Sequence, residues 1–300
     1  MDSKLRIVYM GTPDFAVAGL KALVENGYNV VAVVTMPDKP AGRGHQIQFS
    51  AVKQYAMSQG LPLMQPERLK DSGFLAELSS YKADLQIVTA FRMLPEAVWA
   101  MPRLGTFNLH ASLLPQYRGA APINWAVING EKETGCTTFF LNHNIDTGNI
   151  IMQKRLDIGD DENVGSLHDR LMKMSEEMTI RTVDLIEECD RQGKDVPTTK
   201  QTDSDELKPA PKLFKENTLI DWGKTKNEIY NFVRGLNPYP AAWTELEIRG
   251  QHYSPVKVYK VSKGEGAITM ACKDGEISID ELQLPGKKRM DAKSLLNGLR

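Results

Sequence analysis

The chain has 300 residues, of which 41% are hydrophobic, so it can bury the core of one large domain or of two ordinary ones. Its formal net charge of -1 excludes a general attraction to phosphate groups, and a nucleic-acid partner would need a local basic patch. No uncharged run approaches the length of a membrane-spanning helix.

Cys136, Cys189 and Cys272 are far apart in the sequence and include no Cys-x-x-Cys pair. This spacing argues against a disulfide framework and against a thiolate zinc site. The first residues also lack the apolar core and small-residue cleavage site of a signal peptide. We therefore expect a cytoplasmic protein.

The first part of the chain alternates apolar strands with helices. Continuous apolar runs predict strands at residues 6–10 and 29–35, and a helix that begins near Phe15 separates them. We expect further strands at residues 61–64, 84–89, 105–110, 136–141 and 150–156, and further helices at residues 50–58, 74–80, 122–129 and 164–192. This alternation predicts an α/β, Rossmann-like parallel sheet with helices on both faces.

Residues 36–49 interrupt this pattern, because two prolines and two glycines break any periodicity, and they predict an exposed loop. Residues 193–211 are polar and contain proline, which predicts a linker between a domain at residues 1–192 and a second domain at residues 212–300. The second domain shows short strands with Gly-containing turns, which favour a small β-barrel of the oligonucleotide-binding type.

Gly11-Thr12-Pro13-Asp14 lies between the first strand and the first helix. Backbone N–H groups at such a helix start can bind an anion. The second and third glycines of a dinucleotide fingerprint are absent, and Pro13 removes one donor. A tight turn with proline at the helix start is an equally good interpretation.

Asn108 and His110 are two residues apart in the expected strand at residues 105–110, so their side chains leave the same face. An imidazole exchanges protons near neutral pH, and an amide N–H stabilises a carbonyl oxygen as it becomes an oxyanion. This pair suits acyl transfer, although a histidine at a strand end is often only structural. A loop must follow, because Pro115, Gly119 and Pro122 cannot continue a strand.

Asp146 lies in a polar turn before the strand expected at residues 150–156. A carboxylate there could orient His110 and stabilise its protonated form. The alternative is an Asx-turn in which Asp146 caps its own backbone. His143 is a competing base in the same segment.

Together these segments resemble the folate-dependent formyltransferases. The resemblance rests on Asn108-x-His110, on the loop at residues 112–122, on Asp146-x-Gly148 and on the first turn at residues 11–15. It continues through residues 123–126, 220–222 and 236–240 to Gly286-Lys287-Lys288-Arg289, and so covers nearly the whole chain. It is closest to the members that act on methionyl initiator tRNA, because the shorter glycinamide ribonucleotide enzymes lack the barrel domain.

The resemblance implies transfer of the formyl group of 10-formyltetrahydrofolate to the α-amine of methionyl initiator tRNA, for translation initiation. Asn108 would hold the oxyanion of the tetrahedral intermediate. His110 would stabilise the developing charge and assist proton transfer, and Asp146 would orient His110 and a relay water. The mechanism requires neither a metal nor a covalent enzyme intermediate, and no obligate protein partner is implied.

The resemblance also implies a folate site built from two segments. The first lines the pterin pocket, and Phe91-Arg92 replaces the Tyr-Gly pair that is commoner in the family, so a role of the Tyr hydroxyl does not carry over. The second is the wall of the formyl-transfer site after His110. The expected folate-binding residues are Phe91, Arg92, Met93, Leu94, Ser112, Leu113, Leu114 and Pro115.

Residues 36–49 match the insertion with which the family contacts tRNA, and Arg43 at its Pro-Gly centre suits a phosphate or a base edge. A plain surface loop is the alternative. Three barrel residues would add phosphate contacts that are salt-sensitive and sequence-blind. The expected tRNA-binding residues are Phe15, Arg43, Lys287, Lys288 and Arg289.

Two other functions compete with this one. The first is the same formyl chemistry on a small amine such as an amino-sugar, with the barrel only as a structural cap. The second is a non-catalytic RNA-binding protein built from a Rossmann-like domain and a barrel. Substrate size separates the two enzymes, and the effect of His110→Ala on formylation separates both from the RNA-binding protein.

Overall fold

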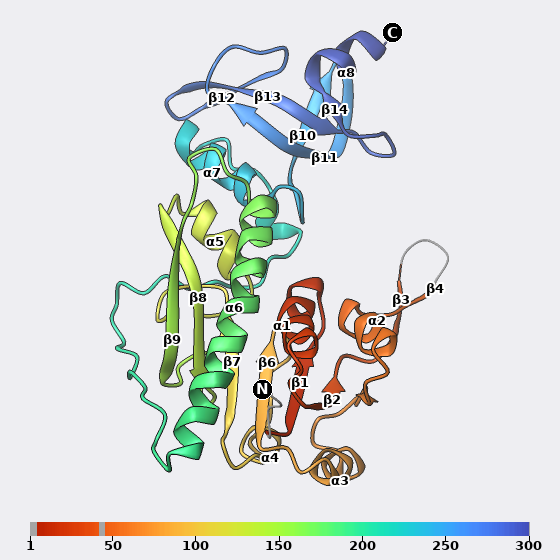
Figure 1. Ribbon diagram of the computed structural model, residues 1–300. Coiled ribbons are helices and arrows are strands. Elements are labelled where there is room, and N and C mark those ends of the chain that lie inside the picture. Colours follow the sequence, from red (N-terminus) through yellow and green to blue (C-terminus); the bar gives the residue numbers. More distant parts are fainter. Residues whose placement is uncertain (1–4, 42–45, 300) are drawn as a thin grey trace. The chain divides into compact units, whose positions relative to one another are not determined.

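The computed structural model describes residues 5–41 and 46–299, with the backbone alone at residues 39–41 and 46–47 (Figure 1). Its contacts divide the chain into two compact units. Unit 1 contains Met1–Arg118, Gly135–Arg155 and Arg170–Leu207, and unit 2 contains Gly119–Thr134, Leu156–Asp169 and Lys208–Arg300. The chain therefore passes between the units several times.

Unit 1 is built on a seven-stranded sheet with the order β5-β2-β1-β6-β7-β8-β9 (Figure 1). Its strands are β1 (Ile7–Gly11), β2 (Val30–Val34), β5 (Leu63–Met64), β6 (Leu85–Thr89), β7 (Thr106–His110), β8 (Glu133–Phe140) and β9 (Ile150–Asp157). β5, β2, β1, β6 and β7 pair in parallel, which confirms the predicted parallel α/β sheet. β8 runs antiparallel to β7.

Helices cover both faces of this sheet, and alternate residues of each strand point to opposite faces. Ile7 and Tyr9 of β1 belong to one core with side chains of α1 (Asp14–Glu25), α2 (Ala51–Ser58) and α6 (Val164–Arg191). Val8 and Met10 belong to a second core with side chains of α3 (Ser72–Ser80) and α4 (Glu96–Trp99). The near-continuous apolar strands of the sequence reflect this double burial.

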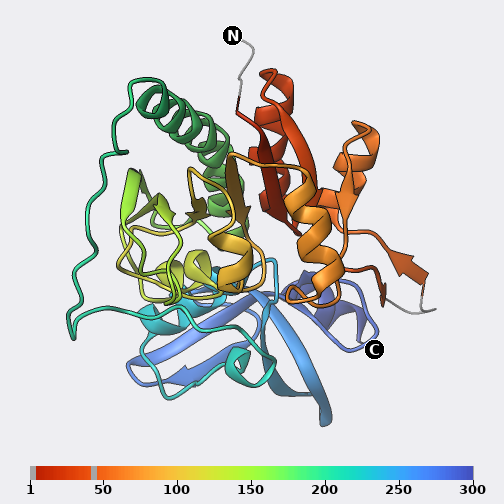
Figure 2. The ribbon, with the colours of Figure 1, turned by 90° about the horizontal axis from the view of Figure 1, so that it is seen from below.

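Two short strands replace the loop expected at residues 36–49. β3 (Lys39–Ala41) and β4 (Gln46–Gln48) pair antiparallel and project from the sheet of unit 1 (Figures 1 and 2). The prediction of an exposed loop missed these two strands, because three residues per strand are too few to show a period. Arg43 lies outside the described residues.

Polar contacts hold the base of this hairpin. The hydroxyls of Thr35 and Ser50 are 2.9 Å apart. Lys53 Nζ lies 2.5 Å from Asp38 Oδ2 and donates to Gln65 Oε1 at 2.9 Å, and the Lys53 side chain is only 11% exposed. These bonds to Lys53 and Gln65 hold the pKa of Asp38 below its usual value. The hairpin therefore leaves unit 1 from an ordered base.

Unit 2 contains a curled antiparallel sheet with the order β10-β11-β13-β12, to which β14 adds beside β13 (Figure 1). Its strands are β10 (Ala242–Ile248), β11 (Gln251–Ser262), β12 (Thr269–Cys272), β13 (Gly275–Gln283) and β14 (Met290–Asp291). The sheet forms a half-barrel, in agreement with the predicted barrel-like second domain.

Helices fill the open side of this sheet. Ile229, Val233 and Leu236 of α7 (Lys226–Leu236) and Leu295 of α8 (Ala292–Gly298) lie in the apolar core of the half-barrel. The α5 helix (Pro122–Ile128) packs through Ile128 against this core, and a 3-10 turn, η1, spans Glu216–Thr218. In the part of the chain that the structure describes, no helix is both long enough and apolar enough to cross a membrane.

Candidate active site

β7 places Asn108 and His110 on one face of the sheet of unit 1, near the carboxyl ends of the parallel strands. Asn108 pairs with Val88 of β6, and Val88 belongs to the core beneath α3 and α4. His110 is the last residue of β7 and is 7% exposed. Ligands of open α/β sheets bind at this edge.

A backbone carbonyl fixes the ring of His110. His110 Nε2 lies 2.8 Å from the carbonyl oxygen of Tyr117. A carbonyl only accepts hydrogen bonds, so Nε2 carries the proton of this bond. Nδ1 is then the ring nitrogen that is left for chemistry. The sequence did not point to Tyr117 for this role, because the contact is made by its backbone.

Asp146 faces that second nitrogen. Its Oδ2 lies 4.0 Å from His110 Nδ1, and the side chains of His110 and Asp146 are 8% and 13% exposed. The separation exceeds a hydrogen bond, so a donor between the two groups, such as a water or an amine, would bond to both. The structure thus brings His110 and Asp146 together, and β7 presents Asn108 on the same face as His110.

Gly148 allows the turn of Asp146 to lie against β8. A Cβ atom at this position would lie 1.6 Å from the carbonyl oxygen of Phe140, which is far inside van der Waals contact. Asp146 itself has a left-handed backbone, with φ of 53°. In the Asp146-x-Gly148 motif, the glycine therefore allows a close approach of two backbone segments, and the aspartate supplies the carboxylate.

For the formyl transfer that the resemblance implies, we expect Gly148→Ala to lower the rate by at least about tenfold, because the turn must move and Asp146 moves with it. Steady-state rates on both substrates measure this effect. Gly264→Ala is the matched control, since nothing lies within 4 Å of a Cβ at that position. Equal rates for the two variants would contradict the assigned role of the turn.

The edge of the sheet carries polar atoms that lack partners among the described residues. Asn108 is half-buried, but its Oδ1 is fully buried and accepts no hydrogen bond there. The hydroxyl of Thr12, which directly follows β1, is also buried and unpaired within the described chain. Such atoms are costly in a folded protein and are enriched at functional sites. They favour a ligand site at the ends of β1 and β7.

The loop after β7 is held by a hydrogen bond within the loop and by another to β8. Ser112 Oγ donates to the carbonyl of Gln116 at 2.7 Å, and the N–H of Leu114 donates to Thr137 Oγ1 at 3.2 Å. Ser112 and Leu114 are buried, whereas Leu113 and Pro115 are half-buried. Leu113 and Pro115 are thus the side chains of this wall that retain exposed surface.

The segment expected to line a pterin pocket, residues 91–95, connects β6 to α4 without regular structure. Met93 is 73% exposed and Leu94 is 7% exposed. Arg92 turns onto the preceding loop, where its guanidinium donates to the carbonyls of Pro66 and Glu67. Burial lowers the pKa of Arg92. In this chain Arg92 braces a neighbouring loop.

His143 contacts α4. Its ring meets that of Trp99 edge-on at 5.3 Å between centroids, and its Nε2 lies 3.8 Å from Glu96 Oε1. The His143 side chain is 69% exposed. These contacts hold the β8–β9 connection, whereas His110 is the buried histidine that faces Asp146.

The residues expected to contact tRNA differ in exposure. Phe15 is 7% exposed at the start of α1, and Lys287 and Lys288 are exposed in unit 2. Arg289 already has a partner, because its Nε and Nη2 donate to Glu281 at 2.6 Å each. Its guanidinium also stacks on Tyr259, 4.2 Å from the ring centroid.

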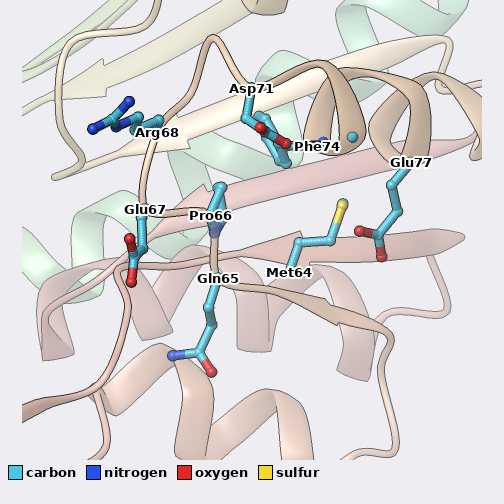
Figure 3. A pocket seen from close by; sticks show the side chains of 9 residues that line it. Met64, Gln65, Pro66, Glu67, Arg68, Asp71, Phe74 and Glu77 are labelled. Atoms are coloured by element: carbon cyan, nitrogen blue, oxygen red, sulfur yellow. Dashed lines mark hydrogen bonds between the residues drawn. The ribbon is translucent and has the colours of Figure 1, made fainter.

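A separate cavity of about 450 Å³ opens beside β5 and α3 (Figure 3). Glu67, Asp71 and Glu77 line it with Arg68 as the basic neighbour, and Asp71 Oδ2 already caps α3 by accepting from the N–H of Phe74. None of the expected catalytic residues lines it. Three carboxylates repel an anionic folate or a phosphate, so we place the site at the ends of β1 and β7 instead.

The sequence profile of the formyl transferase family matches residues 4–183, and the profile of its C-terminal domain matches residues 212–300. The chain belongs to the formyl transferase family. Methionyl-tRNA formyltransferase of Bacteroides thetaiotaomicron is 57% identical over an alignment of 312 positions, which covers 99% of this chain and 96% of that protein. The Bacteroides fragilis protein of the same name is 56% identical over an alignment of 309 positions, which covers 98% of this chain and 95% of that protein.

Solved structures of distant relatives share the fold. HypX from Aquifex aeolicus, solved in complex with tetrahydrofolic acid, superposes with a TM-score of 0.65 at 17% identity. The superposition covers 98% of this chain and 47% of HypX. At this identity the likeness establishes the fold, and the site of the present chain rests on its own residues.

Proposed function

We propose that this chain transfers the formyl group of 10-formyltetrahydrofolate to the α-amine of methionyl initiator tRNA, in the cytoplasm, for translation initiation. The observation that carries the proposal is full-length similarity. Relatives named methionyl-tRNA formyltransferase match at 56–57% identity through both family domains. His110 Nδ1 and the Asp146 carboxylate, which lie 4.0 Å apart at the end of the sheet, would provide the chemistry.

The reaction forms a bond from the methionyl nitrogen to the formyl carbon and breaks the bond from that carbon to N10 of the folate. In the tetrahedral intermediate the formyl oxygen is negative, and the amide N–H of Asn108 would donate to it. The amine loses a proton as it attacks. His110 Nδ1 and Asp146, which lie 4.0 Å apart, would accept that proton through a shared water. The same pair would return a proton to N10 as the folate leaves.

The test is formylation of charged initiator tRNA by the purified protein with 10-formyltetrahydrofolate. We expect labelled methionine on the tRNA to become formylmethionine, with no reaction on free methionine or on an amino-sugar. Reaction with the small amine alone would exclude the tRNA assignment. Binding of tRNA without any formylation would favour the non-catalytic RNA-binding alternative.

We further propose that residues 1–192 carry the reaction, that residues 193–211 connect the two domains although those up to Leu207 belong to unit 1, and that residues 212–300 bind tRNA together with the β3–β4 hairpin. The folate would lie against residues 91–94 and 112–115. Arg43 would meet the tRNA from the catalytic part, whereas Phe15 is only 7% exposed and offers little surface for this contact. The ordered base at Lys53 and Asp38 would hold the β3–β4 hairpin.

In the half-barrel, Lys287 and Lys288 are the better candidates for phosphate contacts, since Arg289 is engaged by Glu281. We expect Lys287→Ala and Lys288→Ala each to raise KM for tRNA and to lower the slope of log KM against log salt by about one. Arg289→Ala should instead lower the melting temperature with a smaller change in slope. Measurements of KM at several salt concentrations decide this, with Lys82→Ala as the control. An unchanged slope in both lysine variants would contradict the assignment.

A further inference from the structure

Gln201 joins the turn of Asp146 to the loop that follows β7. It lies in the segment whose composition predicts a linker, yet it is only 8% exposed. Its Nε2 donates to the carbonyl of Asp146 at 2.9 Å and to the carbonyl of Gly148 at 2.8 Å. Its Oε1 accepts from Arg118 Nε at 3.2 Å and from Nη2 at 2.8 Å. All of these residues belong to unit 1.

The hydrogen-bond partners determine the orientation of the Gln201 side-chain amide. The two carbonyl oxygens only accept hydrogen bonds, and the guanidinium of Arg118 only donates them. A reversed amide would lose all four contacts, so its orientation follows from the network. A glutamate at this position would keep the acceptors for Arg118 but would place oxygen against the carbonyls of Asp146 and Gly148.

Together with their neighbours, these hydrogen bonds form a series of contacts that begins and ends at His110. Tyr117, whose carbonyl holds His110 Nε2, directly precedes Arg118. Arg118 binds Gln201, Gln201 binds the backbone of Asp146, and the carboxylate of Asp146 faces His110 Nδ1. The ring and the carboxylate that it faces are thus positioned by one set of contacts.

Backbone conformation shows that both ends of this path need support. Tyr117 has φ of 61° and Asp146 has φ of 53°. Residues other than glycine rarely adopt this left-handed region unless the surrounding structure holds them there. The bonds from Gln201 to the carbonyls of Asp146 and Gly148 supply that support at the second turn.

We propose that Gln201 is a positioning residue for formyl transfer: it sets the separation between His110 Nδ1 and the carboxylate of Asp146. It acts through Asp146. The inference rests on the proposed function. Displacement of a catalytic group by about 1 Å costs up to about 10²-fold in rate, so loss of this single amide has a measurable effect.

The first experiment compares Gln201→Glu and Gln201→Met with the unmodified enzyme on methionyl initiator tRNA and 10-formyltetrahydrofolate. We expect kcat to fall by about 10- to 100-fold, with each KM changed by less than about threefold. Gln192→Glu is the matched control. It makes the same change in charge at an exposed residue and should retain full activity. If Gln201→Glu does not fold, Gln201→Met decides, because it adds no charge.

The second experiment separates positioning from a general loss of stability. In an Asp146→Asn background, addition of Gln201→Met should lower kcat by less than about threefold, because the residue that it positions is already disabled. A purely structural role would lower kcat in that background by the full factor seen alone.

The outcomes are distinct. An unmodified enzyme that does not formylate methionyl-tRNA refutes the proposed function. An active enzyme whose Gln201 variants keep kcat within threefold refutes the positioning role alone. A rise in KM at constant kcat, or full multiplication of the two effects in the double variant, also refutes it.

Discussion

His110→Gln should lower kcat for formylation by about 10³-fold, within the range that a positioned general acid–base group contributes. The glutamine amide can still donate to the carbonyl of Tyr117, which His110 Nε2 binds at 2.8 Å. It cannot accept and return a proton at the position of Nδ1. The substitution therefore removes the chemistry and keeps the bond that holds the side chain.

Formylation rates and thermal melting measure this prediction together. We expect a melting temperature close to that of the unmodified enzyme for His110→Gln, whereas His110→Ala also leaves the buried carbonyl of Tyr117 without that partner and lowers it. His252→Gln, at a side chain that is 64% exposed in the half-barrel, is the control for a histidine without a catalytic role. Formylation by His110→Gln within tenfold of the unmodified enzyme would show that the imidazole does not carry the proton.

Asn108→Ala should lower kcat by about 10²- to 10³-fold, the usual cost of one oxyanion donor. Its effect on stability should be small or even favourable. Oδ1 of Asn108 is buried without a partner among the described residues, and removal of such an atom relieves a desolvation cost. The combination of a large loss in rate with an unchanged or higher melting temperature is specific to a residue kept for function.

Asn108→Asp extends this test. The aspartate has the same shape, but its carboxylate cannot donate and repels the negative formyl oxygen, so we expect kcat at or below that of Asn108→Ala. Pre-steady-state rates with saturating substrates would measure both variants. If Asn108→Asp kept more than a tenth of the rate, the oxyanion would have to be stabilised elsewhere.

The local patterns of the sequence predicted most of unit 1. Alternation of apolar strands and helices predicted the parallel sheet, because each strand is buried on both faces and each helix covers one face. It failed at the β3–β4 hairpin, where the strands are too short to show a period. The two-residue strand β14 at the end of unit 2 was missed for the same reason, and the seven-residue helix α8, which was also missed, spans only about two turns.

The sequence alone was enough to select Asn108 and His110 as candidate catalytic residues, but it could not place Asp146 beside them. A period of two along β7 is enough to place Asn108 and His110 on one face, and the prolines and glycine that follow are enough to end the strand there. Local strand geometry was thus enough to identify Asn108 and His110 as a pair on one face. Its chemistry followed from the residue types.

Contacts between distant segments required the folded chain. The order of β7, β8 and β9 decides that the turn of Asp146 returns to His110, and Gly148 decides how closely it approaches. Gln201 is 55 residues from Asp146 and 83 from Arg118, and its segment has the composition of a linker. No periodicity connects positions so far apart, because such pairs are selected by strand order and by the need of buried carbonyls and guanidinium groups for partners.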